Sequence, residues 1–311
     1  MIAYALLGFL ALIAIASVTV YLRYHRDMDV SRARLASIPT EVYTSKYGDI
    51  EYRLVGNGPV VLVSHGVTGG VDQGITITDS FVSSGEGYRF LYVSRFGYLK
   101  SSAPPNDASA RLQAAAYKDL LDHLGIDQVF VFGNSAGGPS SMWFAIDFPE
   151  RTRGLILLSS AAPTSGPPPA IPPRLVFEND FLYWAVVKVV PDTLVSVLLP
   201  EDILSTLTTE EKASLIKNVF VFSLPVSERT EGINFDNHIS TPSVTDIPFE
   251  QIKVPTLILQ AVDDPREREG GSELAERIAD SKLVGLTGGH FLLREEKKVQ
   301  TEIAEFIAKN Q

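Results

Sequence analysis

The stretch that decides the fold reads Val129-Phe130-Val131-Phe132-Gly133-Asn134-Ser135-Ala136-Gly137-Gly138. Four consecutive strand-prone apolar residues lead into Gly-Asn-Ser-Ala-Gly, and residues 140–148 then have the pattern of a helix. A continuous Val/Phe run is typical of a strand that is buried on both faces of a parallel sheet. The turn from strand to helix must be tight, so we expect it to hold Ser135 in a strained conformation with its hydroxyl above the sheet.

The residues around this serine fit such a turn. Gly133 and Gly137 stand two residues before and after it, where a Cβ would collide as the strand and the helix close up. Pro139 falls in the first helical turn, where its missing N–H costs nothing. An ordinary glycine-rich turn can share the pattern, but a strand before and a helix after are the setting of a nucleophilic serine.

The composition is that of a globular protein with a large core. The 311 residues allow one large or two small domains. A formal net charge of −10 without a basic stripe argues against a nucleic-acid partner. Cysteine is absent, which excludes disulfides and thiolate chemistry without identifying the compartment. Metal-ligand spacings and phosphate-binding loops are also absent from the sequence, so we expect no cofactor and no metal.

The N-terminal segment differs from the rest of the chain. Residues 2–22 carry no charge, and these 21 residues are long enough to cross a bilayer as a helix. A signal peptide cleaved after Ala16 is the alternative, but no basic residue precedes the run, which is longer than an h-region. We expect an uncleaved single-pass anchor over residues 1–22 and a juxtamembrane tether over residues 23–39. The arginines that follow the span place the catalytic part on the cytoplasmic side: Arg23, Arg26, Arg32 and Arg34.

Strands and helices alternate along the remaining chain. Buried strands are expected near residues 60–63, 91–94, 129–132, 154–159, 254–260 and 282–286, with two antiparallel edge strands before them. This alternation predicts an α/β fold with a doubly wound, mostly parallel sheet. Six prolines within residues 163–173 exclude regular structure there. We therefore expect a core of residues 40–166 and 250–311, interrupted by a mostly helical cap insert at residues 167–249.

A serine hydroxyl needs a base to become a good nucleophile, and only one histidine has a suitable position. His290 lies in a loop after the last strand, downstream of Ser135 and of the acidic pair Asp263-Asp264. In doubly wound sheets, sites form at that edge. The other four are juxtamembrane, within a helix, in the insert or at an earlier strand end: His25, His123, His238 and His65.

The order Ser…Asp…His is that of the α/β-hydrolases, and the chain resembles the cap-bearing members of this family over roughly residues 40–308. The resemblance implies that Ser135, Asp264 and His290 form a catalytic triad. Family members commonly place the acid three residues after a small residue and before proline, which selects Asp264 between Ala261 and Pro265. The motifs that carry the resemblance are His65-Gly66, Arg95-Phe96-Gly97-Tyr98, Gly133–Gly138, Asp264-Pro265 and Gly289-His290-Phe291.

The resemblance also implies an oxyanion hole made by the backbone N–H groups of Ala136 and Val67. We expect a supporting role for the His65 side chain, and for Arg95 a structural ion pair. Haloalkane dehalogenases and epoxide hydrolases of this fold use aspartate where this chain has Ser135, so their chemistry is not expected. Candidate pocket residues are Phe181, Trp184 and Phe291.

These observations predict a membrane-anchored serine hydrolase that cleaves carboxylic esters of small or lipid-like substrates through an acyl-enzyme. Two alternatives share the fold: hydrolysis of a carbon–carbon bond in a diketone-like acid, and release of N-terminal proline from peptides. The second needs acidic groups to hold a free amine, for which Glu201-Asp202 or Glu210-Glu211 are candidates, although a solvated surface explains these pairs better. A catalytically idle binding module is the alternative from another class.

Overall fold

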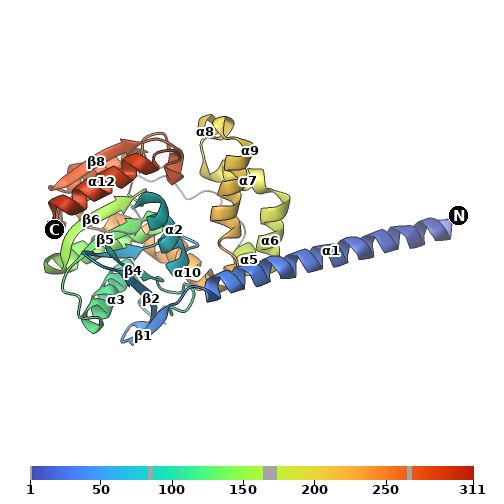
Figure 1. The fold of residues 1–311 in the computed structure, drawn as a ribbon, viewed down its shortest axis with the longest axis horizontal. Helices are drawn as coiled ribbons and strands as arrows, with labels where there is room; N and C mark the ends of the chain where they lie inside the picture. Colours follow the sequence, from blue (N-terminus) through green and yellow to red (C-terminus); the bar gives the residue numbers. More distant parts are fainter. Residues whose placement is uncertain (1, 83–86, 105, 164–173, 265–267) are drawn as a thin grey trace.

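The computed structural model describes residues 2–82, 87–104, 106–163, 174–264 and 268–311, and within these ranges eight strands form one sheet (Figure 1). The strands follow the order β1-β2-β4-β3-β5-β6-β7-β8. Strand β2 runs antiparallel to β1 and β4, and all other neighbours are parallel, as expected for a mostly parallel sheet. The bounds are β1 Glu41–Ser45, β2 Gly48–Gly56, β3 Val60–Ser64, β4 Arg89–Val93, β5 Val129–Asn134, β6 Thr152–Leu158, β7 Thr256–Ala261 and β8 Ser281–Leu286.

The central strands are buried on both faces, which explains their unbroken apolar sequences. In β5, Val129 and Val131 belong to the core on one face, whereas Phe130 and Phe132 belong to the core on the other. Alternate side chains of a strand point to opposite faces, so both cores require apolar residues at every position. The predicted buried strand before Ser135 is therefore confirmed.

Helices cover both faces of the sheet. The first face is covered by α3 (Ala110–His123), α4 (Gly138–Asp147) and α11 (Arg268–Arg277). The second is covered by α2 (Val71–Phe81) and α12 (Glu296–Lys309). The arrangement is the doubly wound α/β fold predicted from the sequence.

The segment between β6 and β7 has two structural parts. Helices α5 to α9 and the π-helical turn η3 stand beside the sheet and pack on one another (Figure 1). The later elements instead add Phe235, Val244, Ile247 and Phe249 to the main core. The expected first residue of the insert, Pro167, lies outside the described ranges. The bounds are α5 Arg174–Phe177, α6 Asp180–Val189, α7 Pro191–Leu198, α8 Glu201–Thr206, α9 Thr209–Leu215, η3 Ile216–Val221, η4 Val226–Glu228, α10 Thr230–Phe235, η5 Asp236–Ser240, η6 Pro242–Asp246 and η7 Phe249–Gln251.

The N-terminal helix α1 is continuous from Ile2 to Ala36 and projects from the domain (Figure 1). Its segment Tyr4–Ala36 is long and apolar enough to cross a membrane, with a mean hydropathy of 2.4 in its most apolar window, and none of that window is buried. A signal sequence has the same properties. The expected tether is helical as far as Ala36, because no helix breaker precedes Pro39.

Candidate active site

Ser135 lies at the sharp turn between β5 and α4. Its backbone φ is +50°, a left-handed conformation that costs energy for a residue with a Cβ. The flanking glycines are required by close packing: a Cβ on Gly137 would lie 2.3 Å from the carbonyl oxygen of Ser64, and one on Gly133 would lie 2.6 Å from Oγ of Ser141. The tight turn expected around Ser135 is therefore confirmed.

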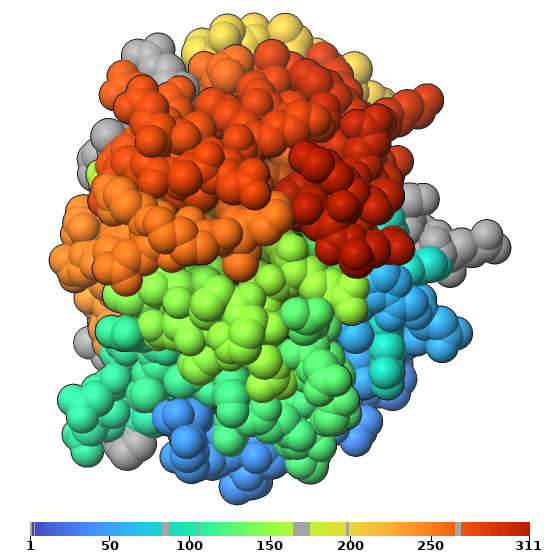
Figure 2. Space-filling view, turned by 90° about the vertical axis from the view of Figure 1, so that its left-hand side faces the viewer, coloured from blue at the N-terminus to red at the C-terminus, as the bar shows by residue number. Residues whose placement is uncertain are grey.

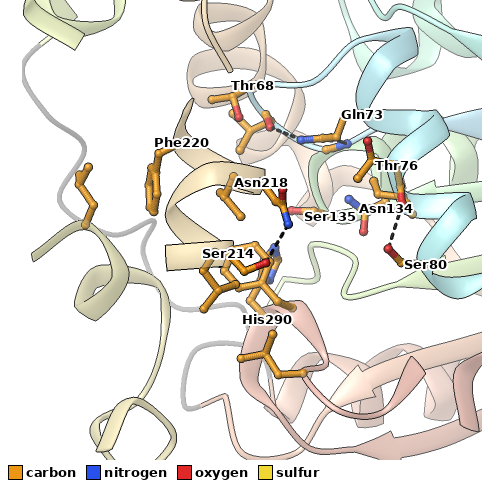
Figure 3. A pocket seen from close by; sticks show the side chains of 18 of the residues that line it. Thr68, Gln73, Thr76, Ser80, Asn134, Ser135, Ser214, Asn218, Phe220 and His290 are labelled. Carbon is orange, nitrogen blue, oxygen red and sulfur yellow. Dashed lines mark hydrogen bonds between the residues drawn. The ribbon is translucent and has the colours of Figure 1, made fainter. Parts of the chain in front are cut away.

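His290 lies in a short 3-10 turn, η8 (Gly289–Phe291), which follows β8. The carboxylate of Asp263 anchors this turn, since it accepts the backbone N–H of Gly288 at 2.8 Å and that of Gly289 at 3.1 Å. Asp263 therefore caps the turn that carries His290. Ser135 and His290 line the same pocket (Figure 3).

Asp264 lies three residues after the end of β7 and is fully buried, whereas Asp263 is half-buried. The expected triad thus comes from the carboxyl ends of β5, β7 and β8, which lie at one edge of the sheet. Pro265 lies outside the described residues.

The loop after β3 carries Val67, the expected second oxyanion donor. The side chain of Gln73 fixes this loop, because it accepts the N–H of Gly66 at 2.8 Å and donates to the carbonyl of Val67 at 3.2 Å. Val67 lines the pocket beside Ser135, and Ala136 follows the serine at the start of the turn into α4.

The buried side chain of His65 also stabilises the loop after β3. Its Nε2 accepts the backbone N–H of Arg95 at 3.0 Å, so Nδ1 carries the proton and donates to the carbonyl of Gly66 at 2.7 Å. Burial, together with the positive charge of Arg95, lowers the pKa of His65 well below its ordinary value. The neutral ring thus has a supporting position, as expected from the sequence.

Arg95 makes a buried ion pair, also as expected. Its guanidinium contacts both carboxylate oxygens of Asp236, at 2.6 and 2.5 Å, and Tyr98 donates to the same carboxylate at 2.5 Å. It also donates to the carbonyls of Gly66 and Ala136, each at 3.2 Å. The sequence did not identify Asp236 as the partner.

A second buried ionic cluster was missed by sequence reasoning. Arg229 pairs with Asp72 at 2.7 Å and donates to the carbonyl of Gly69, in the loop that carries Val67. Arg34 of α1 pairs with the same carboxylate at 2.8 Å. Burial of Asp72 opposes its ionisation, but the charges of Arg229 and Arg34 outweigh it and hold the pKa below its ordinary value. The cluster joins α1, the segment between β6 and β7, and the loop that carries Val67.

The pocket above Ser135 has a volume of about 570 Å³ and a mostly apolar lining. The cap contributes Phe177, Tyr183, Val186, Val187, Leu194, Leu215, Val219 and Phe220, and the core contributes Ile77, Phe81, Leu158, Phe291 and Leu292. Ser214 and Asn218 of the helical segment are hydrogen-bonded at 3.0 Å (Figure 3). Arg294 pairs with Glu211 at 2.9 Å. The other polar residues of the lining include Thr68, Gln73, Thr76, Ser80, Asn134 and Asn237.

Two of the three expected pocket residues lie elsewhere. Phe291 lines the pocket, but Phe181 and Trp184 are not among the described residues that do so. Their rings contact Tyr24 of α1, with centroids 5.3 and 5.7 Å apart, and Trp184 donates to Asp27 at 3.0 Å. The expectation was wrong for these two residues because they lie on the side of α6 that faces α1.

The comparisons agree with the fold. A family model described as alpha/beta hydrolase fold matches residues 59–200. The chain is similar to the α/β hydrolase fold protein of Nakamurella multipartita, with 26% identity and a TM-score of 0.67, over 86% of this chain and 98% of that one. Within the described residues there is no group of three or more His, Cys, Asp or Glu side chains that could hold a metal.

Two curated relatives carry hydrolase names. "Uncharacterized hydrolase YcgS" of Bacillus subtilis (strain 168) is 29% identical over 236 residues, which cover 72% of this chain and 81% of that protein. "2-hydroxy-6-oxo-6-phenylhexa-2,4-dienoate hydrolase" of Comamonas testosteroni is 34% identical over 133 residues, which cover 38% of this chain and 46% of that enzyme. The second alignment thus spans less than half of the relative.

Proposed function

Because the chain belongs to the α/β-hydrolases, we propose that it is a serine hydrolase that cleaves carboxylic esters through an acyl-enzyme. The observation that carries the proposal is the strained Ser135, which shares one pocket with His290. A serine held at φ +50° between a buried strand and a helix matches a nucleophile elbow. The proposed core comprises residues 40–166 and 250–311, with residues 167–249 as the cap.

The proposed reaction has two steps. Oγ of Ser135 attacks the ester carbonyl carbon while His290 takes its proton and Asp264 stabilises the resulting imidazolium. The N–H groups of Ala136 and Val67 bind the oxyanion, each contributing about 2.7–4 kcal/mol. The carbon–oxygen bond to the alcohol then breaks, and the alcohol leaves with the proton from His290. Water, deprotonated by His290, cleaves the acyl-enzyme in the same manner.

The pocket supports an apolar acyl or alcohol group. Its volume of about 570 Å³ and its aliphatic and aromatic lining fit a lipid-like chain. The apolar, uncharged residues 2–22 support a single-pass membrane anchor, and the arginines after them support a cytoplasmic catalytic domain. An ester that partitions into the membrane would fit both features.

Carbon–carbon bond hydrolysis is a second candidate, favoured by the name of the Comamonas relative. Such a substrate has a carboxylate that needs a cationic or hydrogen-bonding partner. Among the described pocket residues Arg294 is the only Lys or Arg, and Glu211 already pairs with it. Because this arginine is already paired, it is a poor partner for a substrate carboxylate. The apolar lining, in contrast, can bind the hydrocarbon part of an ester. Release of N-terminal proline from peptides has less support, because the carboxylate of Glu211, a candidate for binding the free amine, already pairs with Arg294.

Fluorophosphonate labelling of the full-length protein tests the serine chemistry. We expect labelling at Ser135, and hydrolysis of p-nitrophenyl esters that increases with acyl length. A folded protein that does not react with the probe would instead support the binding module. Faster turnover of a 2-hydroxy-6-oxo-dienoate than of every ester would overturn the ester proposal and leave the serine mechanism in place.

A further inference from the structure

The cap helix α6 separates the pocket from the side of the domain from which α1 projects. We propose that α6 lies in the headgroup layer of the membrane, so that its outer side contacts lipid while its inner side forms a wall of the pocket. The inference rests on the proposed membrane anchor and goes beyond it. It assigns to the cap a lipid-binding surface and makes the bilayer the source of the substrate.

Helix α6 has three sides with different neighbours. Its inner side carries Tyr183, Val186 and Val187, which line the pocket. A second side contacts α1 through Phe181, Trp184 and Lys188. At 3.6 residues per turn, the remaining side carries Leu182, Ala185 and Val189. Val189 is 76% exposed and Leu182 and Ala185 are partly exposed, so all three residues on the outer side of this helix are apolar and Val189 projects farthest from the protein.

The charged residues of α6 do not make this outer side polar. Asp180 accepts the backbone N–H and the hydroxyl of Ser227, at 2.9 and 2.7 Å. Lys188 pairs with Asp27 of α1 at 3.0 Å. Both charges are thus directed to partners within the protein, and a helix that is apolar on all sides is normally buried. An apolar medium outside the protein therefore explains the sequence of α6 better than water does.

Contacts with α1 fix the level of α6 along the membrane normal. The uncharged run ends at Leu22, and at 1.5 Å per residue its 21 residues span about 31 Å, the thickness of a hydrocarbon core. The contacts to α6 begin at Tyr24 and include Asp27, about 3 to 8 Å beyond that end. The headgroup layer is about 5 to 7 Å thick on each side. A helix about 10 Å in diameter at this level must enter the headgroup layer.

The surroundings of this contact suit a lipid interface. Arg23 is exposed at the same level of α1, where its cationic group can reach lipid phosphates. Arg26 is also exposed there, and its guanidinium pairs with Asp27 at 2.9 Å. Figure 1 shows that α6 and α7 lie on the side from which α1 projects. The opposite face, shown in Figure 2, is formed by the segments coloured green, blue and orange to red, which include β1 and α12.

This placement has a consequence for substrate entry. One side of α6 lines the pocket through Val186 and Val187, and its outer side carries Val189. Only the width of this helix therefore separates the proposed lipid surface from the pocket. An ester dissolved in the bilayer would reach the apolar pocket around α6 without crossing bulk water. The proposal thus specifies the substrate class as membrane-partitioned esters.

Single-cysteine labelling tests the proposal directly, because the natural chain contains no cysteine. Three full-length variants are prepared: Val189→Cys, Leu12→Cys and Val42→Cys. Each is labelled with a nitroxide and placed in phosphatidylcholine/phosphatidylglycerol vesicles. The collision rate of the nitroxide with oxygen then indicates exposure to lipid, and its collision rate with a nickel chelate indicates exposure to water. We expect a lipid-like signal at positions 189 and 12. The matched valine of β1, which is 47% exposed, should report water.

Each outcome decides between the two proposals. A water-like signal at position 189 together with a lipid-like signal at position 12 would overturn the docking of α6 but not the proposed membrane anchor. Water at both positions would overturn the anchor, and the docking with it. In an activity test, Val189→Glu should lower the ratio of vesicle-embedded to water-soluble ester hydrolysis several-fold, whereas Val42→Glu should leave that ratio unchanged. An unchanged ratio for Val189→Glu would mean that substrate does not enter from the bilayer.

Discussion

The guanidinium of Arg95 binds the carboxylate of Asp236, which lies in the segment between β6 and β7. It also donates to the backbone carbonyls of Gly66 and Ala136, beside the candidate nucleophile. The side chains of Arg95 and Asp236 are almost completely buried, and their two contacts measure 2.6 and 2.5 Å. The carbonyl of Gly66, which Arg95 also contacts, belongs to the same peptide unit as the N–H of Val67. Since we propose that N–H as an oxyanion donor, the ion pair controls the position of a group that acts in the transition state.

The first prediction concerns this pair. Asp236→Asn leaves Arg95 as a buried charge without its carboxylate, and breaking a buried pair costs about 3–5 kcal/mol. We expect a loss of this size in the free energy of unfolding, measured with urea on the detergent-solubilised chain. We also expect kcat to fall more than KM changes.

Glu302→Gln provides the control, because it breaks an ion pair with the exposed side chain of Lys282. Exposed pairs contribute about 0–1 kcal/mol. If both variants lost the same stability, the pair of Arg95 and Asp236 would have no special role.

The second prediction is a pH dependence of stability that arises from His65. Its folded pKa lies well below the ordinary value of 6.5, so between these two pKa values the unfolded chain binds more protons than the folded chain. Stability contributed by the neutral ring is therefore complete above pH 6.5 and is lost as the pH falls below it. Asp72 contributes in the same direction only below the ordinary carboxyl pKa of 3.8, which is a separate window.

Thermal unfolding between about pH 7.5 and pH 5 measures this effect. We expect the unfolding temperature to fall over this range, and to fall less steeply in His65→Gln. The exposed His123 offers a matched His123→Gln control, which should keep the slope of the natural chain. Equal slopes in all three proteins would assign the pH dependence to other groups.

The third prediction concerns Ser135. Ser135→Ala should abolish ester hydrolysis and fluorophosphonate labelling, because alanine has no hydroxyl to attack the carbonyl. The substitution removes one oxygen and keeps the Cβ, so the fold should remain. Ser214→Ala changes a serine on the cap side of the same pocket and should retain both activities. More than a few per cent residual turnover in Ser135→Ala would move the nucleophile elsewhere.

The fourth prediction concerns the N-terminal helix. The protein should fractionate with membranes and resist carbonate extraction, because residues 2–22 match the hydrocarbon thickness. N-terminal sequencing of the mature protein distinguishes the anchor from a signal peptide. A mature chain that starts at Ser17 would mean that the segment is cleaved.

Some features of the fold were predictable because they depend on neighbours in the sequence. The strand before Ser135 and the tight turn around it follow from a Val/Phe run and two glycines a few positions apart. Asp236 was not predictable as the partner of Arg95, because 141 positions separate the two residues and only the folded chain brings them together.

The lining of the pocket was predictable only in part. Apolar residues at helical spacing indicate that α6 packs against other parts of the protein, but they do not say which side of the helix faces α1 and which side faces the pocket. Trp184 was therefore assigned to the pocket, whereas it donates to Asp27. Residues 23–36 contain no helix breaker, which allows the helix to continue to Ala36. The packing of this part of α1 on the domain was missed for a related reason, since the burial of Met28 involves distant parts of the chain.

The last prediction separates two adjacent aspartates. Asp264 is fully buried at the carboxyl end of β7, where an orienting carboxylate would hold the tautomer of His290 and stabilise its charged form. Losing that charge can cost about 10⁴ in turnover, so we expect Asp264→Asn to reduce kcat by at least about two orders of magnitude. Asp263 instead accepts the N–H groups of Gly288 and Gly289.

Asp263→Asn should therefore be the mild member of this matched pair. Asparagine retains a side-chain oxygen that can accept one of the two N–H groups, so the turn that carries His290 keeps part of its anchor. We expect a loss of less than about tenfold in kcat, because the substitution weakens the anchor of this turn but removes no member of the proposed triad. Steady-state kinetics of both variants on one ester, with unfolding temperatures to verify the fold, measures the ranking. The reverse order would assign the catalytic acid to Asp263 and leave Asp264 as a buried structural carboxylate.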